Sequence, residues 1–171
     1  FYQYSDLQFY DLEKQKITQK TFGARVGDIL FAQDDKGVYF VQNIPGSKQL
    51  AYFDLTAQKI RVLYTPQRLG TNMWSLAYRS GSILFIEQNS EKRVLKSYNI
   101  AANTVTTVSE TAIPTSLNLT PLGILYSSPM SGVDNLYLST TDDFSQKRSV
   151  TNSLTRVIDG AIDPVNQALY Y

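Results

Sequence analysis

The chain has 171 residues, of which 43% are apolar and 18% charged, and its formal net charge is +1. It contains no cysteine and no histidine, which excludes disulfides, thiol nucleophiles, serine–histidine triads and histidine-bound zinc. Nucleic-acid binding normally needs a clustered basic face, so this charge predicts no direct nucleic-acid contact. No apolar run approaches the roughly 18 residues of a membrane-spanning helix.

The length fits one domain over residues 1–171, which would bury roughly 70% of its unfolded surface on folding. The first residue is Phe1 rather than methionine. We therefore expect a processed product or a piece of a longer protein, with a further segment upstream.

The sequence repeats itself along its length. Residues 11–17, DLEKQKI, return 43 residues later as DLTAQKI and again, in a more divergent form, as NIAANTV at 99–105. An independent series of apolar segments follows a similar spacing, at 38–40, 83–85, 124–126 and 168–170. A period of about 40 to 45 residues built from short strands is typical of a β-propeller blade, which has four antiparallel strands.

Each repeat divides into four predicted strands. The inner strands, nearest the axis of a propeller, are predicted at 27–33, 73–79, 116–120 and 157–162, each followed by a Gly, Pro, Asp or Asn turn. The apolar series supplies the second strands. Third strands are expected at 7–12, 50–53 and 94–98, and short polar fourth strands at 16–20, 59–64 and 104–108. No segment has sustained 3.6-residue periodicity, so an all-β fold without helix is expected.

The two ends of the chain carry complementary half-blades. The N-terminus begins with a third and a fourth strand, and the C-terminus ends with a first and a second strand. Pairing of 7–12 with the strand that begins at Ala168 would close a four-bladed ring and remove its open edges. The alternative is that the chain is a fragment of a larger propeller.

Several of these segments resemble the TolB-type β-propeller repeat. They are GVYFVQN at 37–43, QLAYFDL at 49–55, KIRVL at 59–63 and IDPVNQALYY at 162–171. The last departs from the family's Pro-Asp-Gly hairpin, because an aspartate precedes the proline and no glycine follows it.

This resemblance implies a blade fold and a periplasmic or otherwise extracytoplasmic protein. Such repeats also form the periplasmic half of CadC-like membrane-anchored transcription regulators. The resemblance therefore implies a sensor domain that is tethered to the membrane through an upstream segment. The expected partner is a small ligand or a protein at one face of the propeller, and no cofactor is expected.

Three arginines are candidate ligand-binding residues. Arg25 and Arg156 each precede a valine that opens an inner strand, and Arg68 lies in the corresponding loop of another repeat. Guanidinium groups from separate blades can grip one carboxylate or phosphate at the mouth of the channel. The alternative is that they are solvated loop charges, or partners of Asp28 and Asp159, two acids expected at the channel mouth.

Two function classes remain open. A binding or sensor module is favoured, because a chain without histidine and cysteine has few groups for catalysis. The alternative is a propeller-type hydrolase or lyase that uses carboxylates or a metal. Two acidic pairs, Asp34–Asp35 and Asp142–Asp143, lie in predicted turns and are interpreted as turn formers, and no metal ligands are proposed.

Overall fold

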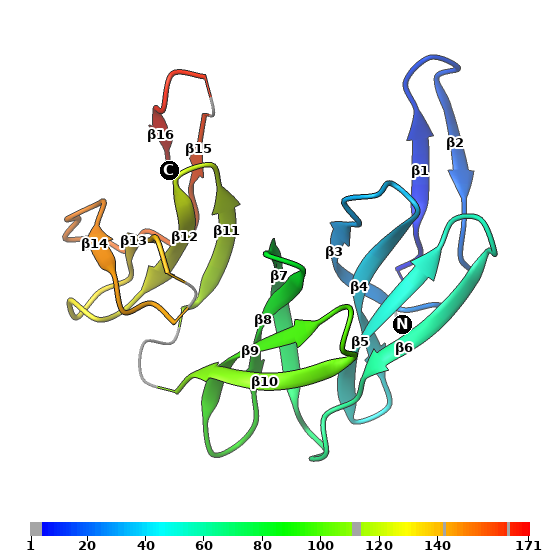
Figure 1. Ribbon diagram of the computed structural model, residues 1–171, viewed down its shortest axis with the longest axis horizontal. Coiled ribbons are helices and arrows are strands. Elements are labelled where there is room, and N and C mark those ends of the chain that lie inside the picture. The colour runs from blue at the N-terminus through cyan, green and yellow to red at the C-terminus, as the bar shows by residue number, and fades with distance from the viewer. Residues whose placement is uncertain (1–4, 111–113, 142, 164) are drawn as a thin grey trace. The chain divides into compact units, whose positions relative to one another are not determined.

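The computed structural model describes residues 5–110, 114–141, 143–163 and 165–171. These residues form strands and turns and no helix, and among them no helix long and apolar enough to cross a membrane is found. The chain divides into two compact units, Phe1–Trp74 and Ser75–Tyr171 (Figure 1). A single domain over 1–171 stays a prediction.

The first unit contains a hairpin and one complete blade. Strands β1 (Gln8–Asp11) and β2 (Lys16–Gln19) pair only with each other. The blade is an antiparallel sheet in chain order, formed by β3 (Val26–Phe31), β4 (Gly37–Ile44), β5 (Ser47–Asp54) and β6 (Lys59–Tyr64). Both sheets are therefore built from neighbours in sequence, as a propeller blade requires.

The second unit contains two blades and a terminal hairpin. One blade is β7 (Asn72–Arg79), which starts just before the unit boundary, β8 (Ser82–Gln88), β9 (Arg93–Asn99) and β10 (Thr104–Ser109). The next is β11 (Ser116–Thr120), β12 (Gly123–Ser128), β13 (Asn135–Ser139) and β14 (Lys147–Ser149). The hairpin is β15 (Ala161–Ile162) with β16 (Leu169–Tyr170).

The predicted all-β fold with four-stranded antiparallel blades is confirmed, and the strand positions agree closely with the repeat analysis. The fourth inner strand is the exception, because only Ala161–Ile162 of the predicted 157–162 is extended. Strand β1 pairs with β2 in the first unit and β15 pairs with β16 in the second, so the pairing predicted between 7–12 and the strand beginning at Ala168 would have to join the two units. Closure of a four-bladed ring therefore stays a prediction, as does the larger-propeller alternative.

The sequence repeat has a local structural cause. Asp11 accepts hydrogen bonds from the backbone N–H groups of Glu13 and Lys14 at 3.0 Å each. Asp54 forms the same turn 43 residues later, and Asn99 accepts from Ala102 in the next copy. An Asp or Asn that bonds the following backbone stabilises the tight turn between third and fourth strands.

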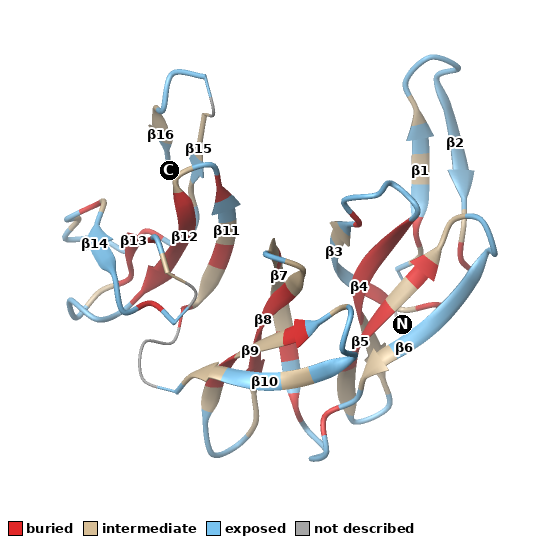
Figure 2. Ribbon diagram, viewed as in Figure 1, coloured by how far each residue is buried: buried red, intermediate tan, exposed pale blue. Residues whose placement is uncertain are grey.

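Burial follows strand position within each blade (Figure 2). The central strands β4 and β12 are largely buried, whereas β2, β6 and β14 are mostly exposed. In the first unit, Leu7 of the N-terminal segment joins the core of the complete blade, with Phe40 and Phe53 among its members. In the second unit, Ile162 and Leu169 of the terminal hairpin pack against a core formed by Leu125, Leu136, Leu138 and Val157. Each half-blade thus packs on the neighbouring complete blade of its own unit.

A recurrent polar pair, which we call the threonine clamp, holds the third strand to the end of the fourth. In the first copy the Leu7 N–H donates to Thr21 Oγ1 at 2.9 Å, and that hydroxyl donates to Asp6 at 2.8 Å. The last copy repeats this with Leu136, Thr151 and Asn135, both distances being 2.9 Å. In the copy that belongs to the β3–β6 blade, the Thr65 hydroxyl donates to the Gln49 side chain at 3.1 Å.

Replacing Thr151 by valine should lower the free energy of unfolding by about 1 to 3 kcal/mol, because the buried Leu136 N–H loses its acceptor. Urea denaturation measures the change. Thr65→Val is the matched control: Thr65 is exposed, so its loss should cost well under half as much. Equal losses for both variants would show that the buried N–H is not the cause.

Candidate functional site

The loop that carries Arg25 is fixed by Asp6. The carboxylate accepts the N–H groups of Gly23 and Ala24 at 2.9 and 2.8 Å. These bonds, that from Ala24 above all, lower the pKa of Asp6 below its ordinary value and keep the carboxylate ionised. Arg25 itself is half-buried with a left-handed backbone (φ 55°), and its carbonyl accepts from the backbone and side-chain amides of Asn43.

The other two predicted arginines lie in comparable loops. Arg68 is exposed in the first unit, and its carbonyl accepts the Thr71 hydroxyl at 2.7 Å. Arg156, in the second unit, donates from Nε to Asp134 at 2.5 Å. The Arg156 side chain is 61% exposed, whereas that of Asp134 is only 10% exposed. Convergence of the three arginines on one anion involves both units and stays a prediction.

The predicted acids are placed as follows. Asp28 lies exposed on β3 of the first unit, and Asp159 lies exposed in the second unit, where it accepts the N–H of Gly160 at 2.8 Å. Arg156 therefore pairs with Asp134 rather than with Asp159, which is three residues away. Among the described residues, no group of three or more carboxylates that would suit a metal ion is found.

One aspartate of each acidic pair stabilises a turn. Asp34 accepts the N–H of Lys36 at 3.1 Å, and Asp143 accepts both the N–H and the hydroxyl of Ser145. The two bonds from Ser145 lower the pKa of Asp143 to about 2. Its partner in the pair, Asp142, lies outside the described residues.

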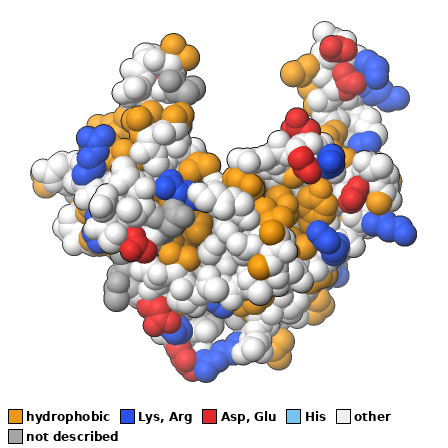
Figure 3. Space-filling model, in the orientation of Figure 1, with side chains coloured by type: hydrophobic (Ala, Val, Ile, Leu, Met, Phe, Trp, Pro, Cys, Tyr) orange, Lys and Arg blue, Asp and Glu red, His pale blue; other side chains and the backbone are white. Residues whose placement is uncertain are grey.

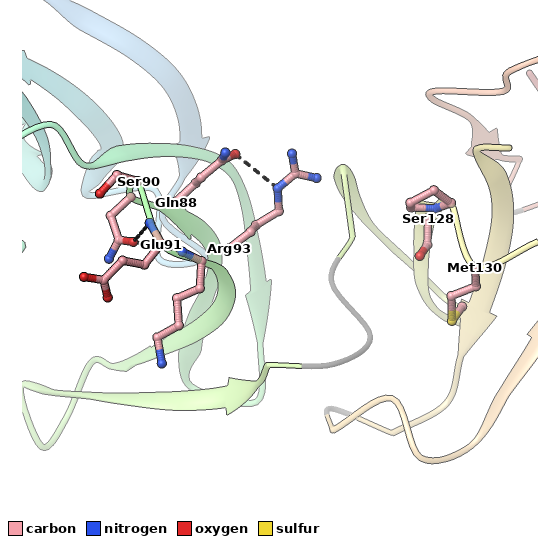
Figure 4. Close-up of a pocket in the computed structure, with 9 residues that line it drawn as sticks. Gln88, Ser90, Glu91, Arg93, Ser128 and Met130 are labelled. Carbon is pink, nitrogen blue, oxygen red and sulfur yellow. Dashed lines mark hydrogen bonds between the residues drawn. The ribbon is translucent and has the colours of Figure 1, made fainter. Parts of the chain in front are cut away.

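A cavity of about 500 Å³ opens in the second unit. Its walls are the β8–β9 and β12–β13 connections, which are the second-to-third strand loops of two blades (Figure 4). The lining residues are Gln88, Asn89, Ser90, Glu91, Lys92, Arg93, Ser128, Pro129 and Met130. In a propeller these loops share a face with the fourth-to-first loops, the face on which a ligand is expected. We call this space the loop cavity.

The first wall is a rigid turn. Asn89 accepts the N–H groups of Glu91 and Lys92 at 2.9 and 3.0 Å, so its side chain fixes the turn. Gln88 and Arg93 are cross-strand neighbours, and Arg93 Nε donates to the Gln88 side-chain oxygen at 3.2 Å. Figure 4 shows the terminal nitrogens of Arg93 directed away from Gln88 toward the second wall.

The second wall combines a buried hydroxyl with apolar surface. Ser128 is buried at the end of β12, and Met130 is 42% exposed in the loop that follows. The loop is held by the Gly132 N–H, which donates to the Pro129 carbonyl at 2.9 Å, and by Asn135, which donates to Ser131 at 3.0 Å. Both walls are therefore fixed by short-range hydrogen bonds.

The β7–β10 blade, which forms the first wall of the loop cavity, lacks the threonine clamp. Counting by the repeat period, Val94 stands where the other copies have Asp6, Gln49 and Asn135, and Glu110 stands where they have threonine. Glu110 forms an ion pair with Lys92 in the cavity wall, with a 2.5 Å distance between Nζ and Oε1. Both side chains are more than half exposed, so the pair contributes little to stability.

None of the residues that line this cavity was predicted from the sequence. One signal was available: the turn at 88–93 carries Glu91, Lys92 and Arg93, whereas the turn of equal length at 43–48 carries only Lys48 as a charged residue. A comparison of the repeats position by position exposes this difference. It does not reveal the second wall, which comes from the next blade.

Comparison with known proteins defines the fold. No model of a protein family matches the chain, and no curated protein matches it either. Among solved structures, TolB from Acinetobacter baumannii superimposes with a TM-score of 0.78 at 13% identity. The match covers 96% of this chain and 42% of that one. The chain has a TolB-like β-propeller fold.

Two further structures support this fold. A putative TolB from Agrobacterium tumefaciens has a TM-score of 0.70 at 13% identity, over 88% of this chain and 56% of that one. An oligogalacturonate lyase in complex with manganese has a TM-score of 0.69 at 12% identity, over 96% and 49%. This TolB-like chain thus spans about half the length of these neighbours. At such identities the likeness concerns fold alone.

Proposed function

We propose that this chain is a non-enzymatic binding or sensor module that takes a small ligand in the loop cavity. The observation that carries the proposal is the cavity itself, which has two walls held by hydrogen bonds and a guanidinium directed across it. Its volume lies within the range of roughly 300 to 1,000 Å³ that is usual for small-molecule sites. A preformed site loses little conformational entropy when it binds.

We further propose that the module works outside the cytoplasm, as the periplasmic part of a membrane-anchored transcription regulator. The TolB-like fold and the similarity of the repeats to those of CadC-like regulators support this proposal by analogy. In that arrangement, an upstream segment tethers the propeller to the membrane, and ligand binding is the signal. A protein partner at the same face is compatible with this role.

The test is a thermal-shift screen of a chemically diverse panel of small molecules. We compare the native chain with Met130→Trp, in which a bulkier side chain narrows the loop cavity from an exposed loop position. Compounds that bind the cavity should raise the midpoint of the native chain and leave that of the variant unchanged.

Two results would contradict the proposal. Compounds that stabilise both proteins equally bind elsewhere, and a panel without any stabilising compound leaves the cavity without a ligand. Chromatography of each stabilising compound after incubation provides the test for turnover. Conversion of a compound by the native chain would favour the hydrolase or lyase alternative over a binding module.

A further inference from the structure

We infer that the loop cavity selects an uncharged ligand rich in hydroxyl groups, such as a sugar, which accepts hydrogen bonds from the side-chain amides of Gln88 and Asn89. This inference rests on the proposed function and gives its ligand a chemical class. It depends on three features of the cavity, which are the balance of its charges, the orientation of two amides and the composition of the opposite wall.

The charges around the loop cavity balance. The first wall carries Glu91, Lys92 and Arg93, and Lys92 pairs with Glu110, so these four side chains sum to zero. Arg93 donates to Gln88, and both Arg93 and Glu91 have further interactions within the chain. The lining residues of the second wall are uncharged. A charged ligand would lose its hydration here without meeting an excess of opposite charge, so the cavity favours an uncharged one.

Two side-chain amides of the first wall are oriented by bonds to their oxygens. The Gln88 oxygen accepts from Arg93 Nε at 3.2 Å. The Asn89 oxygen accepts two backbone N–H groups of its own turn at 2.9 and 3.0 Å, which occupies both of its lone pairs. Within the described part of the chain, the amide nitrogens are therefore the groups that both side chains offer to a ligand. Because an amide nitrogen only donates, the ligand must supply acceptor oxygens.

Serine hydroxyls and apolar surface complete the lining. Ser90 and Ser128 belong to opposite walls (Figure 4). A ligand hydroxyl can accept from an amide and donate to a serine, whereas an ether or carbonyl oxygen only accepts. Pro129 and the adaptable thioether of Met130, which is 42% exposed, offer apolar contact to the C–H groups of a carbon ring. Hydroxyl groups on a carbon ring therefore fit this lining.

The experiment is a titration followed by ¹⁵N NMR, with the side-chain NH₂ signals of Gln88 and Asn89 as the readout. The probes are glucose and two charged counterparts with the same ring, glucuronate and glucosamine. Glucose should shift both NH₂ signals and should bind the native chain more tightly than either charged probe. A glucose titration that moves neither signal, or a charged probe that binds as tightly as glucose, would overturn the inference.

Variants assign the effect to the amides. Gln88→Glu and Asn89→Asp replace an NH₂ donor by an oxygen of similar size and keep the acceptor oxygen, so the wall should stay folded. Each should weaken glucose binding about five- to tenfold, because one hydrogen bond to the ligand is lost. Asn99→Asp is the matched control, since Asn99 also accepts a backbone N–H in a turn of this blade but does not line the cavity. Equal glucose affinities of Asn89→Asp and Asn99→Asp would refute the assignment.

Glu110→Gln tests the balance of charge. The substitution removes the partner of Lys92 without changing a residue that lines the cavity, and it leaves the first wall with one positive charge in excess. Glucuronate should then gain about two- to fivefold in affinity relative to glucose, which corresponds to the strength of an exposed ion pair. The same ratio of the two affinities in the native chain and the variant would show that charge balance does not set the preference, and would overturn the inference.

The two proposals fail in different ways. If panel compounds protect the native chain but not Met130→Trp while glucose moves neither NH₂ signal, the binding module stands and its ligand is not of this class. If no compound distinguishes the native chain from Met130→Trp, the binding site itself is wrong.

Discussion

Deletion of residues 1–21 should abolish folding of the first unit, although the complete blade β3–β6 would remain. Leu7 is 5% exposed and belongs to the same core as Phe40 and Phe53. Phe9 adds an edge-to-face contact with Phe31 at 5.9 Å between ring centroids. Loss of one buried leucine alone typically costs about 2 to 5 kcal/mol, against a total stability of about 5 to 15 kcal/mol.

Circular dichroism and limited proteolysis of the shortened chain measure this loss. The matched control changes the tip of the same hairpin, where Figure 3 shows charged side chains gathered. Glu13→Ala with Lys14→Ala should alter the free energy of unfolding by less than about 0.5 kcal/mol, because both residues are exposed. A deletion variant as stable as the native chain would contradict the assignment of β1–β2 to this core.

Ring closure predicts the same loss of folding for a different reason. Closure would leave a hydrophobic sheet edge exposed when the N-terminal strands are removed. The contacts of Leu7 and Phe9 within the first unit predict the loss with or without a closed ring. The deletion therefore tests the packing of the half-blade, and pairing of β1 with β16 stays a separate prediction.

Replacement of Gly123 by alanine should destabilise the second unit by about 3 to 5 kcal/mol. The glycine begins β12 with φ at 137°, a conformation that side chains rarely adopt. An added Cβ would also overlap the carbonyl oxygen of Ser139, which belongs to the backbone of the neighbouring strand and cannot rotate away. The backbone strain at residue 123 and the overlap with Ser139 therefore both contribute to the loss of stability.

Gly132→Ala separates the two causes. Gly132 has φ at 92°, and a Cβ there would meet nothing within 4 Å. Its replacement should therefore cost only the backbone strain, about 1 to 2 kcal/mol. Urea denaturation of both variants gives the comparison. Similar losses would show that the Ser139 carbonyl yields and that the overlap does not matter.

The blades could be predicted from the sequence because their causes are local. Asp11, Asp54 and Asn99 each set a turn through bonds to backbone groups two or three residues away. Hairpin pairing then follows from strands that are adjacent in sequence, as β4 with β5 shows over its whole length. Short-range patterns of this kind are legible without tertiary information.

The contacts of the predicted site residues were harder to predict, because the partners of charged side chains are not set by proximity in sequence. Arg156 lies three residues from Asp159, yet it donates to Asp134, 22 residues earlier. That choice follows from the β13 end of the blade, where the Val157 N–H donates to the Asp134 carbonyl at 2.8 Å and brings the two segments together. The sequence correctly indicated an aspartate as a partner for Arg156, but the aspartate is Asp134 and not Asp159.

By itself, the sequence determined the all-β class, the period of the blades and the turns that separate their strands, because each depends on residues within one hairpin. Only the tertiary structure decided where the loop cavity lies. The loop cavity joins a turn at 88–93 with a loop at 128–130 on the next blade, and contact between these blades includes the Leu117 N–H donating to Ser75 at 3.0 Å. A space between two loops exists only once the blades that carry them have packed, and that packing depends on side chains some 40 residues apart in the chain.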